Sequence, residues 1–122
     1  MALMSETIKQ IITEIRPGII ATANKDGKPN VSAKGSLRVL DDEHVIFADM
    51  SSPRTTANLR ENPQVSILIF HPKTMRGCRI WGKAEVMDSG DVFENLRSEY
   101  DARNIKVNHV IKIAVEETQE SF

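Results

Sequence analysis

The stretch G-I-I-A-T-A-N-K-D-G-K-P-N-V-S-A-K-G-S-L-R-V-L, residues 18–40, decides the fold class of this chain. Residues 18–23 are apolar and small, and residues 30–40 alternate between apolar and polar side chains. Asp26-Gly27 lies between these two runs, and Asp-Gly between strand-like runs is the strongest short-range signal for a β-hairpin. The sequence therefore predicts two antiparallel strands, with Gly35 marking a bulge or a close approach by another group.

The rest of the chain continues the same alternation of strands and short turns. Further strands are predicted over residues 44–49, 64–70, 79–87 and 107–115, and helices over residues 5–15, 55–62 and 91–102. The strand over residues 64–70 is nearly all apolar, which predicts burial on both faces. Short turns force antiparallel pairing. We expect one mainly β domain over residues 1–122, in which six strands form a small barrel or strongly curled sheet with flanking helices.

Composition excludes several classes of protein. The 122 residues carry 16 basic and 17 acidic side chains, and a net charge near zero argues against a dedicated nucleic-acid binder. The single cysteine, Cys78, cannot form an internal disulfide, and the three histidines are far apart, so no metal site is expected. The apolar runs are too short to span a membrane and the first residues are polar, so the expected compartment is the cytoplasm.

The segment Ser51-Ser52-Pro53-Arg54-Thr55-Thr56-Ala57-Asn58-Leu59 is the most informative for function. It places hydroxyl groups and a guanidinium at the start of a helix, where free N–H groups and a partial positive charge favour an anion. The guanidinium adds a fork that matches phosphate oxygens. One interpretation is a phosphate-binding site. The other is an ordinary helix start, with a capping hydroxyl and a solvated arginine.

Two strands carry further candidates. Side chains alternate across a strand, so Ser32, Lys34, Ser36 and Arg38 are predicted to share one face, open to solvent, a partner or a ligand. Trp81 is beside Gly82 in the middle of a strand, where it serves either the core, an interface or a flat cofactor. The side chains show no convincing nucleophile or acid–base pair, and Cys78 has no base beside it. If the protein is an enzyme, a cofactor supplies the chemistry.

Roughly residues 17–87 resemble the pyridoxamine 5'-phosphate oxidase-like flavoproteins, and the rest of the chain is similar to them in the order of its elements. The resemblance rests on four motifs in order: G-I-I-A-T…D-G-K-P, L-R-V-L-D-D, R-T-T-A-N-L…N-P-Q-V and W-G-K-A-E-V. It implies the FMN-binding split barrel, a six-stranded antiparallel β-barrel of Greek-key type, and a homodimer with two FMN sites at the subunit interface. The small single-domain FMN-binding proteins of this family are nearest in length.

The resemblance also implies which positions contact FMN. The phosphate would be bound at Arg54, Thr55 and Thr56, with Asn58 just beyond. The positions bordering the rest of the cofactor are Val31, Ser32, Lys34, Ala48 and Asp49. Trp81 and Lys83 match a strand near the dimer seam.

The function implied is flavin-dependent oxidoreduction or electron transfer, with a small-molecule or protein redox partner that the sequence does not name. A non-catalytic flavin carrier or sensor, or a relative that binds deazaflavin F420 or haem, is the alternative. The chain ends E-E-T-Q-E-S-F, without the arginine- and histidine-bearing segment with which the oxidases proper hold their substrate, so oxidation of pyridoxamine phosphate is not expected.

Overall fold

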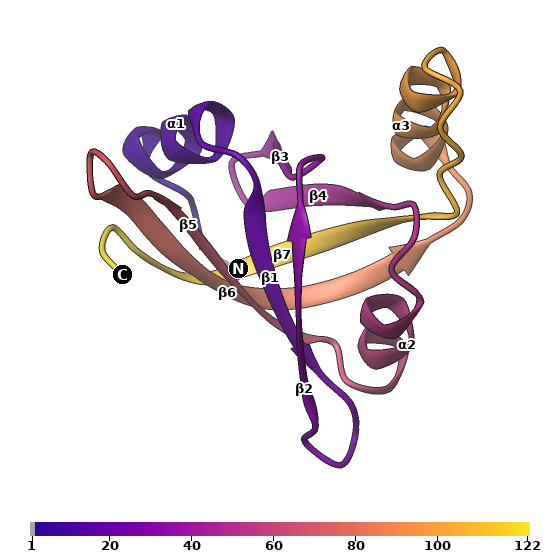
Figure 1. Ribbon diagram of the computed structural model, residues 1–122, viewed down its shortest axis with the longest axis horizontal. Coiled ribbons are helices and arrows are strands. Elements are labelled where there is room, and N and C mark those ends of the chain that lie inside the picture. The colour runs from indigo at the N-terminus through magenta and orange to yellow at the C-terminus, as the bar shows by residue number, and fades with distance from the viewer. Residues whose placement is uncertain (1) are drawn as a thin grey trace.

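The computed structural model describes residues 2–122 and shows three helices and seven strands (Figure 1). The helices are α1 (Glu6–Glu14), α2 (Pro53–Glu61) and α3 (Asp91–Asp101). The strands are β1 (Gly18–Ala23), β2 (Pro29–Lys34), β3 (Arg38–Asp41), β4 (His44–Asp49), β5 (Gln64–His71), β6 (Arg76–Met87) and β7 (His109–Gln119).

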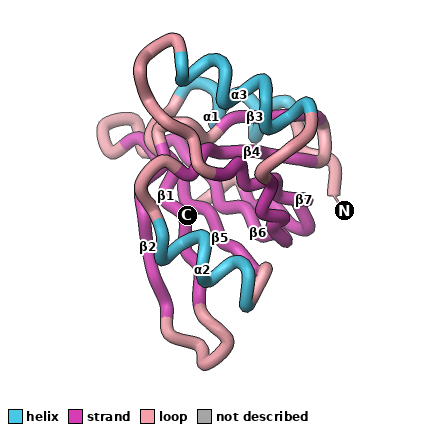
Figure 2. The backbone as a smooth tube through the Cα atoms, turned by 90° about the vertical axis from the view of Figure 1, so that its right-hand side faces the viewer, coloured by secondary structure: helices cyan, strands magenta, loops and turns pink. Residues whose placement is uncertain are grey.

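All seven strands form one antiparallel sheet with the order β2-β1-β5-β6-β7-β4-β3. Its two edge strands, β2 and β3, follow each other in the chain and are joined by only residues 35–37. Because this link is so short, the two edges of the sheet must come close together, and the sheet curls into a barrel that is open between β2 and β3 (Figures 1 and 2). This confirms the mainly β split barrel with flanking helices.

The strand count differs from the prediction because the strand expected over residues 30–40 is two strands. Gly35 is not a bulge within one strand: the chain turns there and passes from one edge of the sheet to the other. Ser36 and Leu37 are buried in this turn, and the Ser36 hydroxyl accepts a hydrogen bond from the Ala48 N–H at 2.9 Å. The alternation continues through the turn in the sequence, which is why the break is not apparent there.

The core consists of two clusters of buried side chains. Ile8, Ile11 and Ile12 of α1 are buried on the central cluster that includes Phe47 and Ile67. A second cluster lies between α3 and the outer side of β4 and β7, and contains Phe93, Leu96, Tyr100, Ile46 and Val110. In Figure 1, α3 projects from one end of the barrel and α2 lies near the opposite end of β1 and β2.

Strand β5 is buried on one face only, which corrects the prediction of burial on both. Val65, Ile67 and Ile69 point into the core, whereas Ser66 and Leu68 are only half-buried. The outer face of β5 is covered by none of the three helices in residues 2–122. Within those residues, no helix is both long enough and apolar enough to cross a membrane.

Candidate functional site

The start of α2 is organised around free backbone donors. Ser52 is the residue before the helix, yet no side chain caps it, and Pro53 occupies the first helical position. The Ser52 hydroxyl accepts a hydrogen bond from the Lys34 ammonium instead. Pro53 has no N–H and the Thr56 N–H donates to the Ser52 carbonyl, so the N–H groups of Arg54 and Thr55 are the ones left at this helix start. The helix start thus differs from one capped by a side chain.

Strand β2 presents its polar side chains to this helix start. The Ser32 and Thr55 hydroxyl oxygens are 3.1 Å apart, and the Asn30 amide donates to Thr55 Oγ1 at 3.3 Å. Lys34 is 7% exposed. Of the three predicted possibilities for this face, solvent, a partner or a ligand, free exposure to solvent does not hold at Lys34, which is buried beside Ser52 at the start of α2.

The other two members of that predicted row lie elsewhere. Ser36 is buried in the turn after β2, and Arg38 belongs to β3, where it forms an ion pair with Glu99 at 2.9 Å. The break between β2 and β3 separates these two side chains from Ser32 and Lys34. The polar surface beside α2 is therefore shorter than the sequence suggests.

Arg54 stands at the open end of this surface. Its side chain is exposed and makes no hydrogen bond or ion pair with any other group in residues 2–122. It lines a cavity of about 190 Å³ together with Lys28, Asn30 and Asn58. Asn58 is buried and donates to Thr22 Oγ1 at 3.1 Å, which fixes α2 on β1. Asn30, which lines this cavity, links the Arg54 side of the surface to the Thr55 hydroxyl.

A larger, separate cavity of about 470 Å³ is lined by Lys34 and, at the end of α3, by Tyr100. Ala48, Met50 and Ser52 line it, and its charged lining groups are all cationic: Arg16, Lys34 and Arg103. Burial lowers the pKa of Lys34, and the nearby negative charge of Asp49 partly offsets this effect. The cavity is therefore suited to a molecule that combines a flat body with negative charge.

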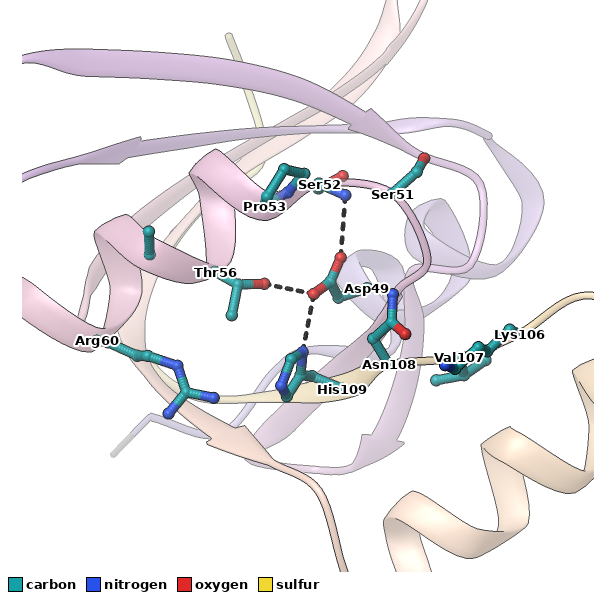
Figure 3. Close-up of a pocket in the computed structure, with 11 residues that line it drawn as sticks. Asp49, Ser51, Ser52, Pro53, Thr56, Arg60, Lys106, Val107, Asn108 and His109 are labelled. Carbon is teal, nitrogen blue, oxygen red and sulfur yellow. Dashed lines mark hydrogen bonds and ion pairs between the residues drawn. The ribbon is translucent and has the colours of Figure 1, made fainter.

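The opposite flank of α2 holds a different cluster, centred on Asp49 (Figure 3). The Asp49 carboxylate is 4% exposed and accepts hydrogen bonds from the Ser52 N–H at 3.0 Å and the Thr56 hydroxyl at 2.7 Å. His109 Nδ1 is 3.0 Å from the same carboxylate. Burial alone would raise the pKa of Asp49, but the hydrogen bonds from Thr56, His109 and Ser52 outweigh it and hold the pKa below its usual range.

The structure divides the nine predicted site residues among several places. Ser32, Lys34, Arg54 and Thr55 lie on the β2 flank of α2, and Ala48 lines the adjoining cavity. Asp49 and Thr56 join the cluster with His109, and Asn58 packs on β1. Val31 is 64% exposed on the outer face of β2, pointing away from α2. Their contacts with a cofactor stay a prediction.

Several functional candidates were not found from the sequence. Arg60 directly follows the motif over residues 51–59 but has no role in that prediction, and Arg16, Arg103 and His109 lie far from the motif in the chain. Only the pairing of β4 with β7, in which Asp49 is opposite His109, brings the histidine to the site. Among residues 2–122, no group of three or more His, Cys, Asp or Glu side chains is placed to hold a metal ion.

The remaining candidates have structural positions. Trp81 lies on the outer face of β6, with the Arg79 guanidinium 5.2 Å from the centre of its ring. Gly82 allows a close approach by the backbone of β7 at Ala114. Cys78 is fully buried, and burial together with the charge of Glu120 raises the pKa of its thiol to about 11. A thiol with so high a pKa is unreactive.

Known proteins resemble this chain in sequence and in fold. An uncharacterised protein of Methanocaldococcus jannaschii, MJ0282, is 41% identical over 75 residues, which cover 60% of this chain and 49% of that protein. The match thus spans about half the length of this relative. The structure of HupZ from Group A Streptococcus superposes with a TM-score of 0.87 at 25% identity, over 95% of this chain and 92% of HupZ.

Other solved structures share the fold at lower identity. An FMN-binding protein of Syntrophomonas wolfei has a TM-score of 0.84 at 16% identity, over 93% of this chain and 83% of that one. An F420 reductase and HutZ, the haem storage protein of Vibrio cholerae, have TM-scores of 0.72 and 0.74 at 21% and 18% identity. They cover 97% and 98% of this chain, and 100% and 95% of their own.

The family model for pyridoxamine 5'-phosphate oxidase matches residues 4–122, which include the hairpin, the start of α2 and both flanks of that helix. The chain therefore belongs to the pyridoxamine 5'-phosphate oxidase family.

Proposed function

We propose that this protein binds FMN on the β2 flank of α2 and serves in flavin-dependent oxidoreduction or electron transfer. The observation that carries the proposal is the anion site at the start of α2. There the exposed guanidinium of Arg54 and the uncapped N–H groups lie at the start of the helix, and the paired hydroxyls of Ser32 and Thr55 lie on its β2 flank. Guanidinium and helix N–H groups are donors that suit a phosphate.

The groups beyond the phosphate site fit the rest of FMN. Ser32 and Lys34 lie along the path from Arg54 to the larger cavity, where they would bind the ribityl chain. The cavity of about 470 Å³ would take the ring. When bound, FMN supplies hydride or single-electron transfer. The ammonium of Lys34, with Arg16 and Arg103, would favour the negative charge of a reduced flavin there.

The proteins that share this fold support a flavin as the cofactor, but they do not establish it, because their own cofactors differ. The Syntrophomonas wolfei structure is described as FMN-binding, whereas HutZ stores haem and another relative by fold is an F420 reductase. A visible spectrum of the purified protein reconstituted with each cofactor separates these: flavin bands support the proposal, and a Soret band points to haem. Consumption of NAD(P)H with an electron acceptor then distinguishes an oxidoreductase from a flavin carrier.

We also propose that the protein is a homodimer in the cytoplasm. The outer face of β2, β1, β5 and β6 carries small and apolar side chains in adjacent register, Ala33 beside Ile19 and Ile19 beside Leu68. Val31 on the same face is 64% exposed. The Nε of Arg79, also on this face, is buried yet has no hydrogen-bond partner within residues 2–122. A second copy of the chain would cover this surface.

Replacing Val31 by aspartate should therefore shift the protein from dimer to monomer. A carboxylate on each copy would be desolvated without a partner, which weakens association by tenfold or more. Sedimentation velocity measures the shift. Met75→Asp is a matched control, because Met75 is 65% exposed at the tip of the β5–β6 turn. Two results would show that this surface is no dimer interface. In one, the wild type sediments as a monomer. In the other, the wild type is a dimer and Val31→Asp has the same sedimentation coefficient.

Replacing Arg54 by glutamine should weaken FMN binding about 10- to 150-fold, the range for the loss of a charged hydrogen bond of about 1.5–3 kcal/mol. Quenching of FMN fluorescence gives the dissociation constant. Riboflavin, which lacks the phosphate, should bind the variant and the wild type equally. A change of less than about twofold for FMN, or an equal loss for riboflavin, would place the phosphate elsewhere.

A further inference from the structure

The β7 flank of α2 contains a cavity of about 590 Å³ that the proposed flavin site does not use. Its lining comes from α2, from the loop before it, and from the segment that leads into β7. The helix itself separates this cavity from Ser32, Thr55 and Arg54, which face β2. Its size is within the range of small-molecule sites in proteins.

The polar end of this cavity is built around an oriented histidine. The Asp49 carboxylate accepts hydrogen bonds from the Ser52 N–H and the Thr56 hydroxyl (Figure 3). His109 Nδ1 lies 3.0 Å from the same carboxylate, and this contact orients the imidazole ring. The other ring nitrogen, Nε2, has no hydrogen-bond partner within residues 2–122. In Figure 3 the guanidinium of Arg60 extends toward the side of the ring that faces away from Asp49. The guanidinium donors of Arg60 and one oriented imidazole nitrogen are thus left for a ligand.

The other residues that line the cavity indicate which charge and which apolar surface a ligand would need. Arg60 and Lys106 are cationic, exposed and without an ion pair in residues 2–122, so an anion is favoured. The buried carboxylate of Asp49, directly behind the imidazole, disfavours a second negative charge. Pro53, Ala57 and Val107 supply apolar surface along the cavity. A singly charged anion with an apolar body therefore fits better than a phosphate.

We propose that this cavity is a second ligand site, which binds a small organic carboxylate through the Arg60 guanidinium and His109 Nε2. Arginine matches both oxygens of a carboxylate. The imidazole adds a third donor, Nε2–H, when both ring nitrogens are protonated, with Nδ1–H on Asp49. Such a site would admit a carboxylate-bearing molecule next to the loop that also borders the proposed flavin cavity, since Ser51 and Ser52 line both cavities.

Benzoate is a suitable probe because it joins one carboxylate to an apolar ring. Titration into the full chain, followed by NMR of the His109 imidazole nitrogens and the Asn108 amide, should give saturable shifts. Arg60→Gln should weaken binding about tenfold or more, and because Arg60 is exposed, its replacement leaves folding intact. Arg54→Gln, on the other flank of the same helix, should leave benzoate binding unchanged. Benzamide, the neutral analogue, should not bind.

The titration is repeated in the presence of saturating FMN and with inorganic phosphate. The proposal is supported if benzoate still binds in the presence of FMN, and if inorganic phosphate binds more weakly than benzoate. Displacement of benzoate by FMN would make the cavity part of the flavin site, and equal binding of benzamide would overturn carboxylate recognition. Because the titration does not need FMN, a failure of the flavin proposal leaves this test intact. An absence of saturable shifts at His109 would refute the second site.

Discussion

Replacing Gly82 by alanine is expected to destabilise the protein by about 3 kcal/mol or more. Gly82 is in β6 at the point where the pairing with β7 changes register. A Cβ atom there would clash with the backbone carbonyl oxygen of Ala114 and lie 2.8 Å from Ile113 Cγ2. The carbonyl belongs to the central β6–β7 ladder and cannot move without breaking it, so no side-chain rotation relieves the contact.

Thermal unfolding measured at equal protein concentration tests this expectation. For a chain of this length, about 3 kcal/mol corresponds to a fall in Tm of roughly 10 °C. Gly35→Ala is the matched control, since an added Cβ there meets nothing within 4 Å and its φ is not in the left-handed region. Its Tm should stay level or rise slightly. If Gly82→Ala melts like Gly35→Ala, the β6–β7 register in the structure is wrong at this point.

The two glycines also show what the sequence could and could not predict about the fold. Both interrupt a strand pattern, and both were candidates for a bulge or a close approach. Gly82 is such a place, whereas Gly35 ends β2 and sends the chain to the other edge of the sheet. The difference depends on which strands pair across the barrel. Local patterns predicted the helices and hairpins well, but they contain no information on that long-range pairing.

The same limit applies to the candidate site: its local part could be predicted, and its long-range part could not. The motif around Arg54 is continuous in sequence, so its helix start and its donors could be predicted directly. For Lys34 the sequence left open whether its strand face meets solvent, a partner or a ligand, because alternation shows only which residues share a face. The position of α2 determines what covers that face. His109 needed the pairing of β4 with β7. Residues far apart in the chain thus complete a site whose centre was evident locally.

Replacing Asp49 by alanine is expected to lower the free energy of unfolding by about 3 kcal/mol at neutral pH, from the loss of charged hydrogen bonds in a buried position. The carboxylate joins three elements: it accepts from Ser52 before α2, from Thr56 within α2, and pairs with His109 of β7. Asp88→Ala is the control, because Asp88 is exposed, and its effect should be within about 0.5 kcal/mol.

The pH dependence separates the charge of Asp49 from its packing. Its pKa in the folded protein is below the usual value because the hydrogen bonds from Thr56, His109 and Ser52 outweigh the effect of burial. The folded state therefore favours the charged form, and this stabilisation is present above the unfolded pKa of about 4 and is lost as the pH falls through the lower folded pKa. Urea unfolding should show a difference between wild type and Asp49→Ala that is full above pH about 5 and shrinks below pH about 4. A difference that stays constant down to pH 2 would mean that Asp49 contributes through shape alone, and that His109 is positioned by the strand rather than by its carboxylate partner.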